Sequence, residues 1–435
     1  MGEGALVALI PPPAPAIVCM PVGVADAIAQ DRSRGRWEAR LRASRQWPGQ
    51  QPTGPVSASV PERRSRAERS EATCDEPTTG PCENHPMSIR IGYKASAEQF
   101  APRELLEFSV EAERRGLDII AVSDHFQPWR HNGGHAPSAL TWLGAAGQAT
   151  SRVVLGTSVL TPTLRYHPSI VAQAFGTLGA LNPGRVYLGV GSGEALNETP
   201  ATGEEFPGRK ERRLRLAESI ELIRRLWTEE RVDFAGDYYQ TSGATIYDRP
   251  EAPVPIFVAA SGPLAAKLAG RVGDGFICTS GKDPELYRTL LGKVQEGARE
   301  AGRDPSQVRR QIEIKVSYDR DLDHAYRACH WWAALALTPE QKEGIEDPIE
   351  MERVADANVD RAHTRFIVSD DPQHVVDRIG PYLDLGFEDL VVHAPGEDQR
   401  RFLEQFCEDV LPLLRRRAEG PPAAAAADTP AAPAA

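Results

Sequence analysis

The chain has 435 residues, of which 26% are charged and 41% are hydrophobic, and its formal net charge is −11. This composition is typical of a globular protein, and the acidic charge argues against a nucleic acid or an anionic membrane as the main partner. No apolar stretch approaches the roughly 18 unbroken residues of a membrane-spanning helix. The six cysteines are too few and too scattered for a disulfide framework, and their spacing predicts no metal site.

The two ends differ in composition from the middle of the chain. Residues 1–87 contain proline-rich runs and many arginines, with no sustained hydrophobic period after Ala29, which predicts disorder. One hypothesis is that translation starts at Met87; a regulatory or targeting arm is the alternative. Residues 418–435 are rich in alanine and proline and are also expected to be disordered. The folded domain is therefore predicted to span residues 88–417.

In this domain, short apolar segments alternate with amphipathic ones. The predicted strands span residues 89–93, 119–123, 153–159, 186–190, 254–259, 275–278, 311–317 and 390–393. The predicted helices span residues 102–115, 168–181, 210–227, 263–269, 284–301 and 399–415. A long insertion with Trp331, Trp332 and Lys342 follows the seventh strand. Several strands are apolar throughout, as strands buried on both faces should be. The pattern predicts a (β/α)8 barrel with insertions, and a doubly wound sheet is the alternative fold.

Polar residues follow the predicted strands, where such a barrel carries its chemistry. Asp124 and His125 follow the second strand, and Thr161 follows the third. The fourth strand leads into a glycine-rich segment with Glu194, and the sixth leads into a segment with Lys282. This concentration of acids, a histidine, hydroxyls and a lysine at strand ends predicts an enzyme.

Two of these residues suit proton transfer. A neutral imidazole at His125 can accept a hydroxyl proton near pH 7, although a histidine here could equally cap the core. Glu194 is a candidate acid, or alternatively a carboxylate stabilised at a helix N-terminus. The run 189–193 contains three glycines without the spacing of a dinucleotide fingerprint, so close approach of the backbone to a flat cofactor is the preferred interpretation.

Three basic residues lie far apart in the sequence: Lys282, Lys342 and Arg365. Solvation at the surface is the default expectation for each. Lys282 is more informative, because it belongs to the segment Thr279-Ser280-Gly281-Lys282 at a strand end. Several cations together with hydroxyl or backbone donors are what a phosphate dianion requires.

Several long segments resemble one known family, the coenzyme F420-dependent glucose-6-phosphate dehydrogenases of the luciferase-like barrel superfamily. The similarity covers residues 89–416. The segments that carry it are 92–100, 123–131, 156–163, 193–198, 275–282 and 393–396.

The resemblance implies a luciferase-like barrel, a cytoplasmic homodimer, coenzyme F420 as cofactor and glucose 6-phosphate as substrate. It implies His125 and Glu194 as the proton-transfer pair, with Glu98 and Trp129 lining the site. The implied sugar-phosphate contacts are Thr279, Lys282, Lys342 and Arg365. The implied coenzyme contacts are Asp124, Ser158, Val159, Thr161, Ser192, Gly193, Asn197, Ser261, Gly262, Leu264 and Ala265, with a non-prolyl cis peptide bond between Ser158 and Val159.

The chain departs from the family pattern at Ser192, where threonine is usual, and at Ser261, where glycine is usual. Ser192 keeps the hydroxyl. Ser261 adds a side chain beside the phosphate-bearing tail of the coenzyme, so this departure is expected to affect coenzyme affinity. The loop before Arg365 is also one residue shorter than usual.

The implied reaction is hydride transfer from C1 of glucose 6-phosphate to C5 of the deazaflavin, which gives 6-phosphogluconolactone. His125 would take the C1 hydroxyl proton, and Glu194 would protonate the reduced ring at N1, although sequence alone also allows the reverse assignment. Glu194 must then be protonated at working pH, which burial or a nearby acid such as Glu98 would favour. The alternatives are an F420-dependent dehydrogenase of another alcohol, a flavin-dependent monooxygenase, and a binding protein without activity.

Overall fold

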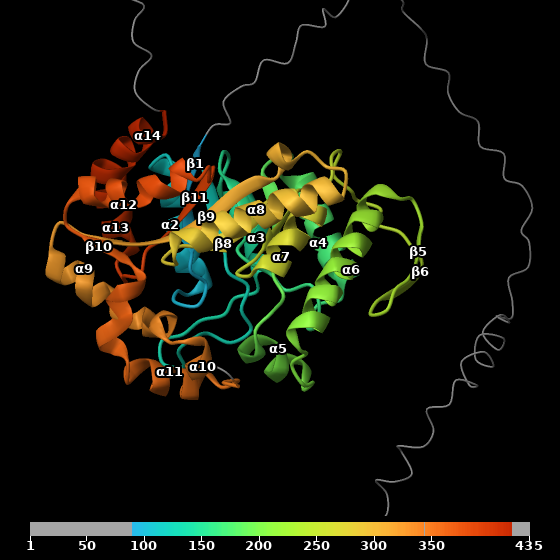
Figure 1. Cartoon of the computed structure of the whole chain (residues 1–435), viewed down its shortest axis with the longest axis horizontal. Coiled ribbons are helices and arrows are strands. Elements are labelled where there is room, and N and C mark those ends of the chain that lie inside the picture. The colour runs from blue at the N-terminus through green and yellow to red at the C-terminus, as the bar shows by residue number, and fades with distance from the viewer. Residues whose placement is uncertain (1–88, 343, 420–435) are drawn as a thin grey trace, which may run out of the picture. The chain divides into compact units, whose positions relative to one another are not determined.

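The computed structural model describes residues 89–342 and 344–419, and its central feature is a closed barrel of parallel strands (Figure 1). Neighbouring strands pair in the order β9, β11, β1, β2, β3, β4, β7 and β8, and β8 pairs back with β9. This closure confirms the predicted barrel and excludes the doubly wound sheet. The barrel strands are β1 (Arg90–Ala95), β2 (Ile119–Val122), β3 (Val154–Thr157), β4 (Val186–Val190), β7 (Ile256–Ala259), β8 (Gly275–Thr279), β9 (Arg309–Tyr318) and β11 (Asp389–His393).

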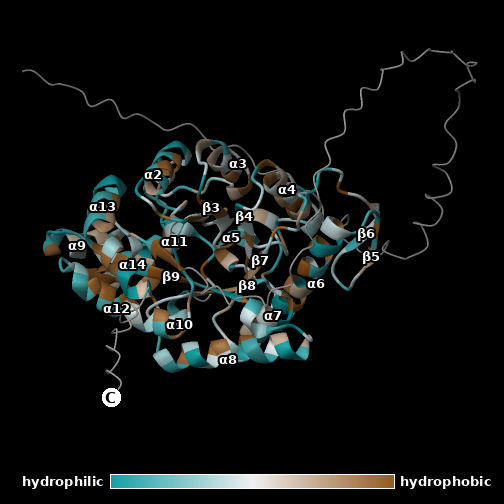
Figure 2. Ribbon diagram, turned by 90° about the horizontal axis from the view of Figure 1, so that it is seen from above, coloured by the Kyte–Doolittle hydropathy of each residue, from teal (hydrophilic) through white to brown (hydrophobic). Residues whose placement is uncertain are grey.

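Helices surround the barrel on the outside, and Figure 2 shows them around the ring of strands. The surrounding helices include α2 (Pro102–Arg114), α3 (Ala139–Ala149), α4 (Pro168–Leu181), α6 (Arg209–Thr228), α7 (Pro263–Val272), α8 (Pro284–Glu300), α12 (Pro372–Asp384) and α13 (Gln399–Gln405). Five of these helices, α2, α4, α7, α8 and α12, begin at a proline. Proline fits the first helical turn, because an N–H there would have no partner within the helix. Strand residues are buried on both faces, between these helices and the barrel interior.

The strand register decides which side chains point into the barrel. Lys94 of β1 lies beside Ala121 of β2, and Lys315 of β9 lies beside His393 of β11. Glu313 of β9 lies beside Thr279 of β8. Apolar side chains fill much of the interior, and they include Ile119, Ala121, Tyr187, Phe257, Ile277 and Val391. The charged residues of β1 and β9 are therefore exceptions inside an otherwise apolar barrel.

Some elements differ from the predicted ones. The third strand was predicted to reach residue 159 but ends at Thr157, and Leu160 forms only an isolated bridge to Val190. The predicted helix 399–415 is interrupted by a π-helical turn, Phe406–Val410, and continues as α14 (Leu411–Glu419). Residues 418 and 419 are therefore helical, and the predicted start of the disordered tail at 418 is wrong by two residues.

Short elements without a long periodic pattern escaped prediction. They include the antiparallel hairpin of β5 (Val232–Ala235) and β6 (Gln240–Ala244), in which only Val232 and Phe234 are buried. The insertion after β9 contains α9 (Leu322–Ala328), α10 (Pro339–Lys342), α11 (Pro348–Asp356) and the extra strand β10 (Ile367–Ser369), and β4 is followed by the short helix α5 (Ala195–Thr202).

The predictions for residues 1–87, including a start at Met87, and for the tail beyond Glu419 lie outside the described residues. Among the described helices, none is both long and apolar enough to cross a membrane.

Candidate active site

The segments after the barrel strands meet at one end of the barrel, where Figure 1 shows the short helices α5, α10 and α11. His125 follows β2, Glu194 follows β4, and Lys282 follows β8. Parallel strands carry their carboxyl ends to the same rim, so residues far apart in the sequence share this end of the barrel.

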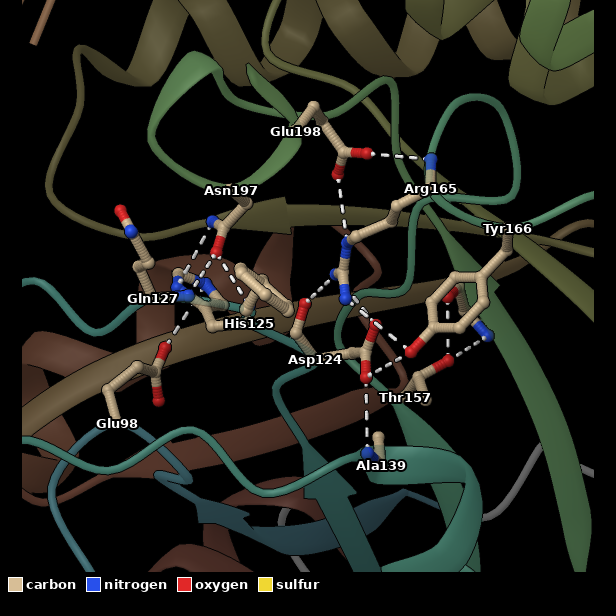
Figure 3. A network of polar contacts seen from close by, with 12 residues as sticks. Glu98, Asp124, His125, Gln127, Ala139, Thr157, Arg165, Tyr166, Asn197 and Glu198 are labelled. Carbon is tan, nitrogen blue, oxygen red and sulfur yellow. Dashed lines mark hydrogen bonds and ion pairs between the residues drawn. The ribbon is translucent and has the colours of Figure 1, made fainter. Parts of the chain in front are cut away.

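His125 is held from both sides of its ring. Its Nε2 lies 3.3 Å from Oε1 of Glu98, and its Nδ1 lies 3.3 Å from Nδ2 of Asn197. The Asn197 oxygen accepts hydrogen bonds from the backbone N–H groups of Phe126 and Gln127, which fixes its amide orientation. Asn197 therefore donates to Nδ1, and this pattern places the hydrogen of a neutral imidazole on Nε2, toward Glu98 (Figure 3).

Glu98 is a buried carboxylate in contact with His125. Burial alone would raise the pKa of Glu98, but His125, Lys94 and the hydroxyl of Ser123 together hold it below its usual value. The Ser123 hydroxyl donates to the second carboxylate oxygen. An ionised carboxylate beside Nε2–H stabilises the imidazolium that forms when the other ring nitrogen takes a proton. The ring of Trp129 lies 6.3 Å from that of His125, between centroids.

Beside His125, Arg165 joins two buried carboxylates, Asp124 and Glu198 (Figure 3). Arg165 lies 2.8 Å from Oδ2 of Asp124 and 3.2 Å from Oε1 of Glu198. The other oxygen of Asp124 accepts from Ala139 N–H and from the Tyr166 hydroxyl. Burial raises the pKa of Glu198, and Arg165 offsets part of that rise. The Asp124 carboxylate is thus fully buried and partnered within the protein, and its contact with a coenzyme stays a prediction.

Glu194 lies at the N-cap of α5 with its side chain exposed, and it makes no capping hydrogen bond. Its charge acts on two cations, Lys342 and Arg212, where it opposes part of the lowering of each pKa that burial causes. Glu98, expected to act on Glu194, instead pairs with His125, and Lys94 is the other charge that acts on it. Glu194 is therefore neither buried nor influenced by Glu98, the two conditions expected for it from sequence.

The three predicted phosphate-binding cations come together at the rim. Burial, together with repulsion from Arg365, Lys315 and Lys282, lowers the pKa of Lys342 to about 8. Burial and the charges of Arg365 and Lys315 also lower the pKa of Lys282. The charges of the other cations contribute to both lowered pKa values, so these cations are close enough to repel one another, and a bound dianion would relieve that repulsion.

Neighbouring groups orient two of these cations. The Lys342 ammonium lies 4.3 Å from the centre of the Trp129 ring, a cation–π distance. The Arg365 guanidinium donates to the backbone oxygens of Gly281 (2.9 Å) and Ser280 (3.4 Å), next to Lys282. The substrate residues predicted from different parts of the chain are therefore neighbours.

The predicted coenzyme contacts lie along the same rim. The peptide bond between Ser158 and Val159 is cis, as the resemblance implies, and Lys94 donates to the Ser158 oxygen. Thr161 is buried, and Gly193 has a φ of 83°, a conformation that favours glycine. Ser192 is half-buried, while Ser261, Gly262, Leu264 and Ala265 form the accessible N-terminal end of α7.

These features fit a flat coenzyme with a phosphate-bearing tail. A side chain at Gly193 would lie 3.1 Å from Thr161 and from Glu198, whereas one at Gly262 would meet nothing within 4 Å. The first N–H groups of α7 have no partner within the helix and suit an anion. The rim thus offers a helix N-terminus for a phosphate with open space at Gly262, while the backbone of Gly193 lies close to Thr161 and Glu198.

Sequence reasoning missed five charged or titratable residues near this rim. Two of them share one strand face with Gln311: in the β9 segment, Gln311, Glu313 and Lys315 point inward and alternate with the apolar Ile312, Ile314 and Val316. That period of two inside a buried strand was the available signal. The missed residues are Lys94, Arg165, Glu313, Lys315 and His393.

The sequence matches the profile of the luciferase-like monooxygenase family over residues 86–389. A relative from Intrasporangium calvum, named F420-dependent glucose-6-phosphate dehydrogenase, is 60% identical over 331 residues, which cover 75% of this chain and 99% of the relative. A relative from Kribbella flavida with the same name is 58% identical over 332 residues, with 76% and 99% covered.

A solved structure shares the fold at a TM-score of 0.71 and 35% identity, covering 76% of this chain and 100% of the other. It is an F420-dependent secondary alcohol dehydrogenase in complex with an F420-acetone adduct. The chain therefore belongs to the luciferase-like monooxygenase family, within the group whose members are named F420-dependent glucose-6-phosphate dehydrogenases.

Proposed function

We propose that this protein oxidises glucose 6-phosphate at C1 with coenzyme F420 as the hydride acceptor and releases 6-phosphogluconolactone. The observation that carries the proposal is the meeting, at one rim, of the His125–Glu98 pair and the cations Lys282, Lys342 and Arg365. An alcohol oxidation needs a base, and a phosphorylated substrate needs several cations. Relatives with this activity in their names match 75–76% of this chain and 99% of their own length.

His125 is the base in this proposal. Its Nε2–H faces the ionised Glu98, which leaves Nδ1 as the nitrogen that takes the C1 hydroxyl proton. Nδ1 now contacts Asn197 at 3.3 Å, a long and weak contact that a hydroxyl can replace. Glu98 then stabilises the positive ring, as the carboxylate does in a catalytic triad.

Bound coenzyme F420 supplies the hydride acceptor. Ser158, Val159, Thr161, Ser192, Gly193 and Asn197 are the residues proposed to hold its ring, and Ser261, Gly262, Leu264 and Ala265 its phosphate-bearing tail. Lys282, Lys342, Arg365 and Thr279 orient the sugar phosphate, so that binding energy far from C1 is used to align the reacting carbon.

Glu194 is proposed to hold the proton that the reduced coenzyme ring takes up at N1. Glu194→Gln is expected to lower kcat at least about 100-fold while the dissociation constant for the coenzyme changes little, because the amide keeps the shape but carries no acidic proton. Steady-state kinetics and coenzyme titration check this. Glu205→Gln, at an exposed position soon after α5, is the control. An unchanged kcat in Glu194→Gln would remove Glu194 from proton transfer.

The charge of Lys342 predicts a pH dependence. Its pKa is lowered to about 8, so its ammonium is present at pH 7 and is lost as the pH rises through 8. Since kcat/KM reports free-enzyme groups, its value for glucose 6-phosphate should fall about tenfold between pH 7 and pH 9. Lys342→Met should lower kcat/KM at pH 7 and flatten this part of the profile. A profile that keeps its full slope in Lys342→Met would contradict the assignment.

Another alcohol is the alternative substrate, since a structural relative is a secondary alcohol dehydrogenase. The cation group disfavours it, because an uncharged alcohol leaves three neighbouring positive charges without a counter-ion. A panel of glucose 6-phosphate, glucose and 2-propanol decides: the proposal expects kcat/KM to be highest for the phosphorylated sugar, and a preference for 2-propanol would overturn it. The homodimer and the cytoplasmic location implied by the resemblance stay predictions, which size determination in solution and cell fractionation would test.

A further inference from the structure

A buried cluster of charges lies inside the barrel next to the proposed substrate site. Its centre is Glu313 of β9, whose carboxylate lies 3.0 Å from Nζ of Lys315, 3.4 Å from Nζ of Lys94 and 3.5 Å from Nδ1 of His393. Burial alone would raise the pKa of Glu313, but Lys315, Lys94 and His393 hold it well below its usual value. The carboxylate is therefore ionised and anchors the cluster.

The members of this cluster differ in how well they are partnered. Lys94 has a second acceptor, the backbone oxygen of Ser158. Lys315 has three ammonium N–H donors and a side chain only 3% exposed, yet Glu313 is its only acceptor in the described part of the chain. Neither ring nitrogen of His393 has a hydrogen-bond partner among the described residues. Unused donors of Lys315 therefore lie on the inner wall of the rim, next to a histidine ring whose polar contact there is the 3.5 Å approach to Glu313.

Lys315 faces the proposed phosphate site. Its backbone N–H donates to the Ser280 hydroxyl (3.1 Å), and Arg365 donates to the backbone oxygens of Ser280 and Gly281. Lys315 is thus a neighbour of the segment that carries Lys282. The positive charge of Lys315 contributes to the lowered pKa values of both Lys282 and Lys342, which agrees with this placement.

A structural ion pair is the alternative explanation for Lys315. Such a pair would leave few donors unused, and Lys94 fits it, because Glu313, Glu98 and the Ser158 oxygen all act on its charge. Lys315 does not fit it, because it shares Glu313 with Lys94 and has no second acceptor among the described residues. A buried ammonium with unused donors is costly unless an acceptor or an anion completes it. Lys315 is the member of the cluster with unused donors on the substrate side.

We propose that Lys315 is a fourth substrate cation, which binds the phosphate of the sugar phosphate from the barrel interior, and that Glu313 positions its ammonium. This inference rests on the proposed function for the identity of the substrate. Lys315 belongs to a barrel strand, whereas Lys282, Lys342 and Arg365 lie outside the strands. The phosphate would therefore be held from the barrel interior as well as from the rim.

The test compares full-length wild type with Lys315→Met and with Lys293→Met, a control that removes an outer lysine paired with Glu296 on α8. Lys315→Met should raise KM for glucose 6-phosphate about 10- to 100-fold, the range expected for lost hydrogen bonds between charged groups. The value of kcat/KM for unphosphorylated glucose should change little. A merely structural role would lower kcat/KM for glucose 6-phosphate and for glucose alike, and that result would overturn the proposal.

Binding of inorganic phosphate, measured by calorimetry without coenzyme, separates this inference from the proposed function. If Lys315→Met weakens phosphate binding at least tenfold, the inference holds even where wild type fails to oxidise glucose 6-phosphate. If wild type oxidises glucose 6-phosphate and the variant binds phosphate as tightly as wild type, the inference alone fails. Lys315→Gln keeps a hydrogen-bond donor for Glu313 and is measured instead if Lys315→Met does not fold, with the same expected results.

Discussion

Replacement of His125 by alanine is expected to lower kcat by about 10²- to 10⁴-fold, the usual contribution of a positioned base. The imidazole is the ring that Glu98 and Asn197 hold at the rim, and alanine leaves no group to accept the C1 hydroxyl proton. Coenzyme binding should survive, because the Asn197 oxygen still accepts from the backbone of residues 126 and 127. Stopped-flow measurement of hydride transfer under saturating substrate checks the value.

Two controls make the His125 result specific. His330→Ala removes an exposed histidine of the insertion and should leave kcat unchanged. Glu98→Gln keeps a similar shape but loses the charge beside Nε2, so kcat should fall while the coenzyme affinity stays the same. Full activity of His125→Ala would mean that another group accepts the proton, and the mechanism would have to be rebuilt around that group.

Replacement of Arg165 by methionine is expected to lower the free energy of unfolding by about 3–5 kcal/mol, because the variant buries charge without a partner. The Arg165 side chain is 8% exposed, and its partners Asp124 and Glu198 are 0% and 1% exposed. Methionine fills a similar volume but leaves both carboxylates without their cation. Urea unfolding of the two proteins, followed by circular dichroism, measures the difference.

Arg353→Met is the matched control for Arg165. Arg353 pairs with Glu350 on the surface of α11, where the arginine side chain is 68% exposed. Exposed pairs of this kind contribute about 0–1 kcal/mol. If Arg165→Met lost no more unfolding free energy than Arg353→Met, Asp124 and Glu198 would have other partners. The Arg165 ion pairs would then not be what stabilises the segment beside His125.

The barrel could be predicted from sequence because its strands are short, apolar and regularly spaced. Segments such as Ile119–Val122 and Val186–Val190 are apolar and buried on both faces, as the strands of a parallel barrel are. The rim could also be predicted, since parallel strands bring their carboxyl ends together. Asp124, His125, Glu194 and Lys282 were found in this way, from their places just after strands.

The partners within the site could not be predicted, because they depend on side-chain directions and on distant parts of the chain. Lys342 meets Trp129 although more than 200 residues separate them, and Lys342 belongs to an insertion without a long periodic pattern. Asp124 stands beside His125 in sequence, but its carboxylate turns away to Arg165. Adjacent residues in a loop can thus serve different layers of one site.

The substitution at Ser261 was expected to affect the coenzyme tail. In the structure Ser261 is exposed and lies just before the N-cap glycine of α7. Its side chain is thus at the surface of the rim, where it can either donate to a phosphate or crowd it. Ser261→Gly, compared with wild type in a coenzyme titration, tells the two effects apart by the sign of the affinity change.

The central claim is transfer of hydride from C1 of glucose 6-phosphate to coenzyme F420 on this protein. The most direct test mixes the purified protein, oxidised coenzyme F420 and glucose 6-phosphate deuterated at C1, without oxygen, and follows deazaflavin absorbance together with the mass of the reduced coenzyme. The account predicts that the absorbance falls and that each reduced coenzyme gains one deuterium. An unchanged absorbance, or a reduced coenzyme without deuterium, would contradict it.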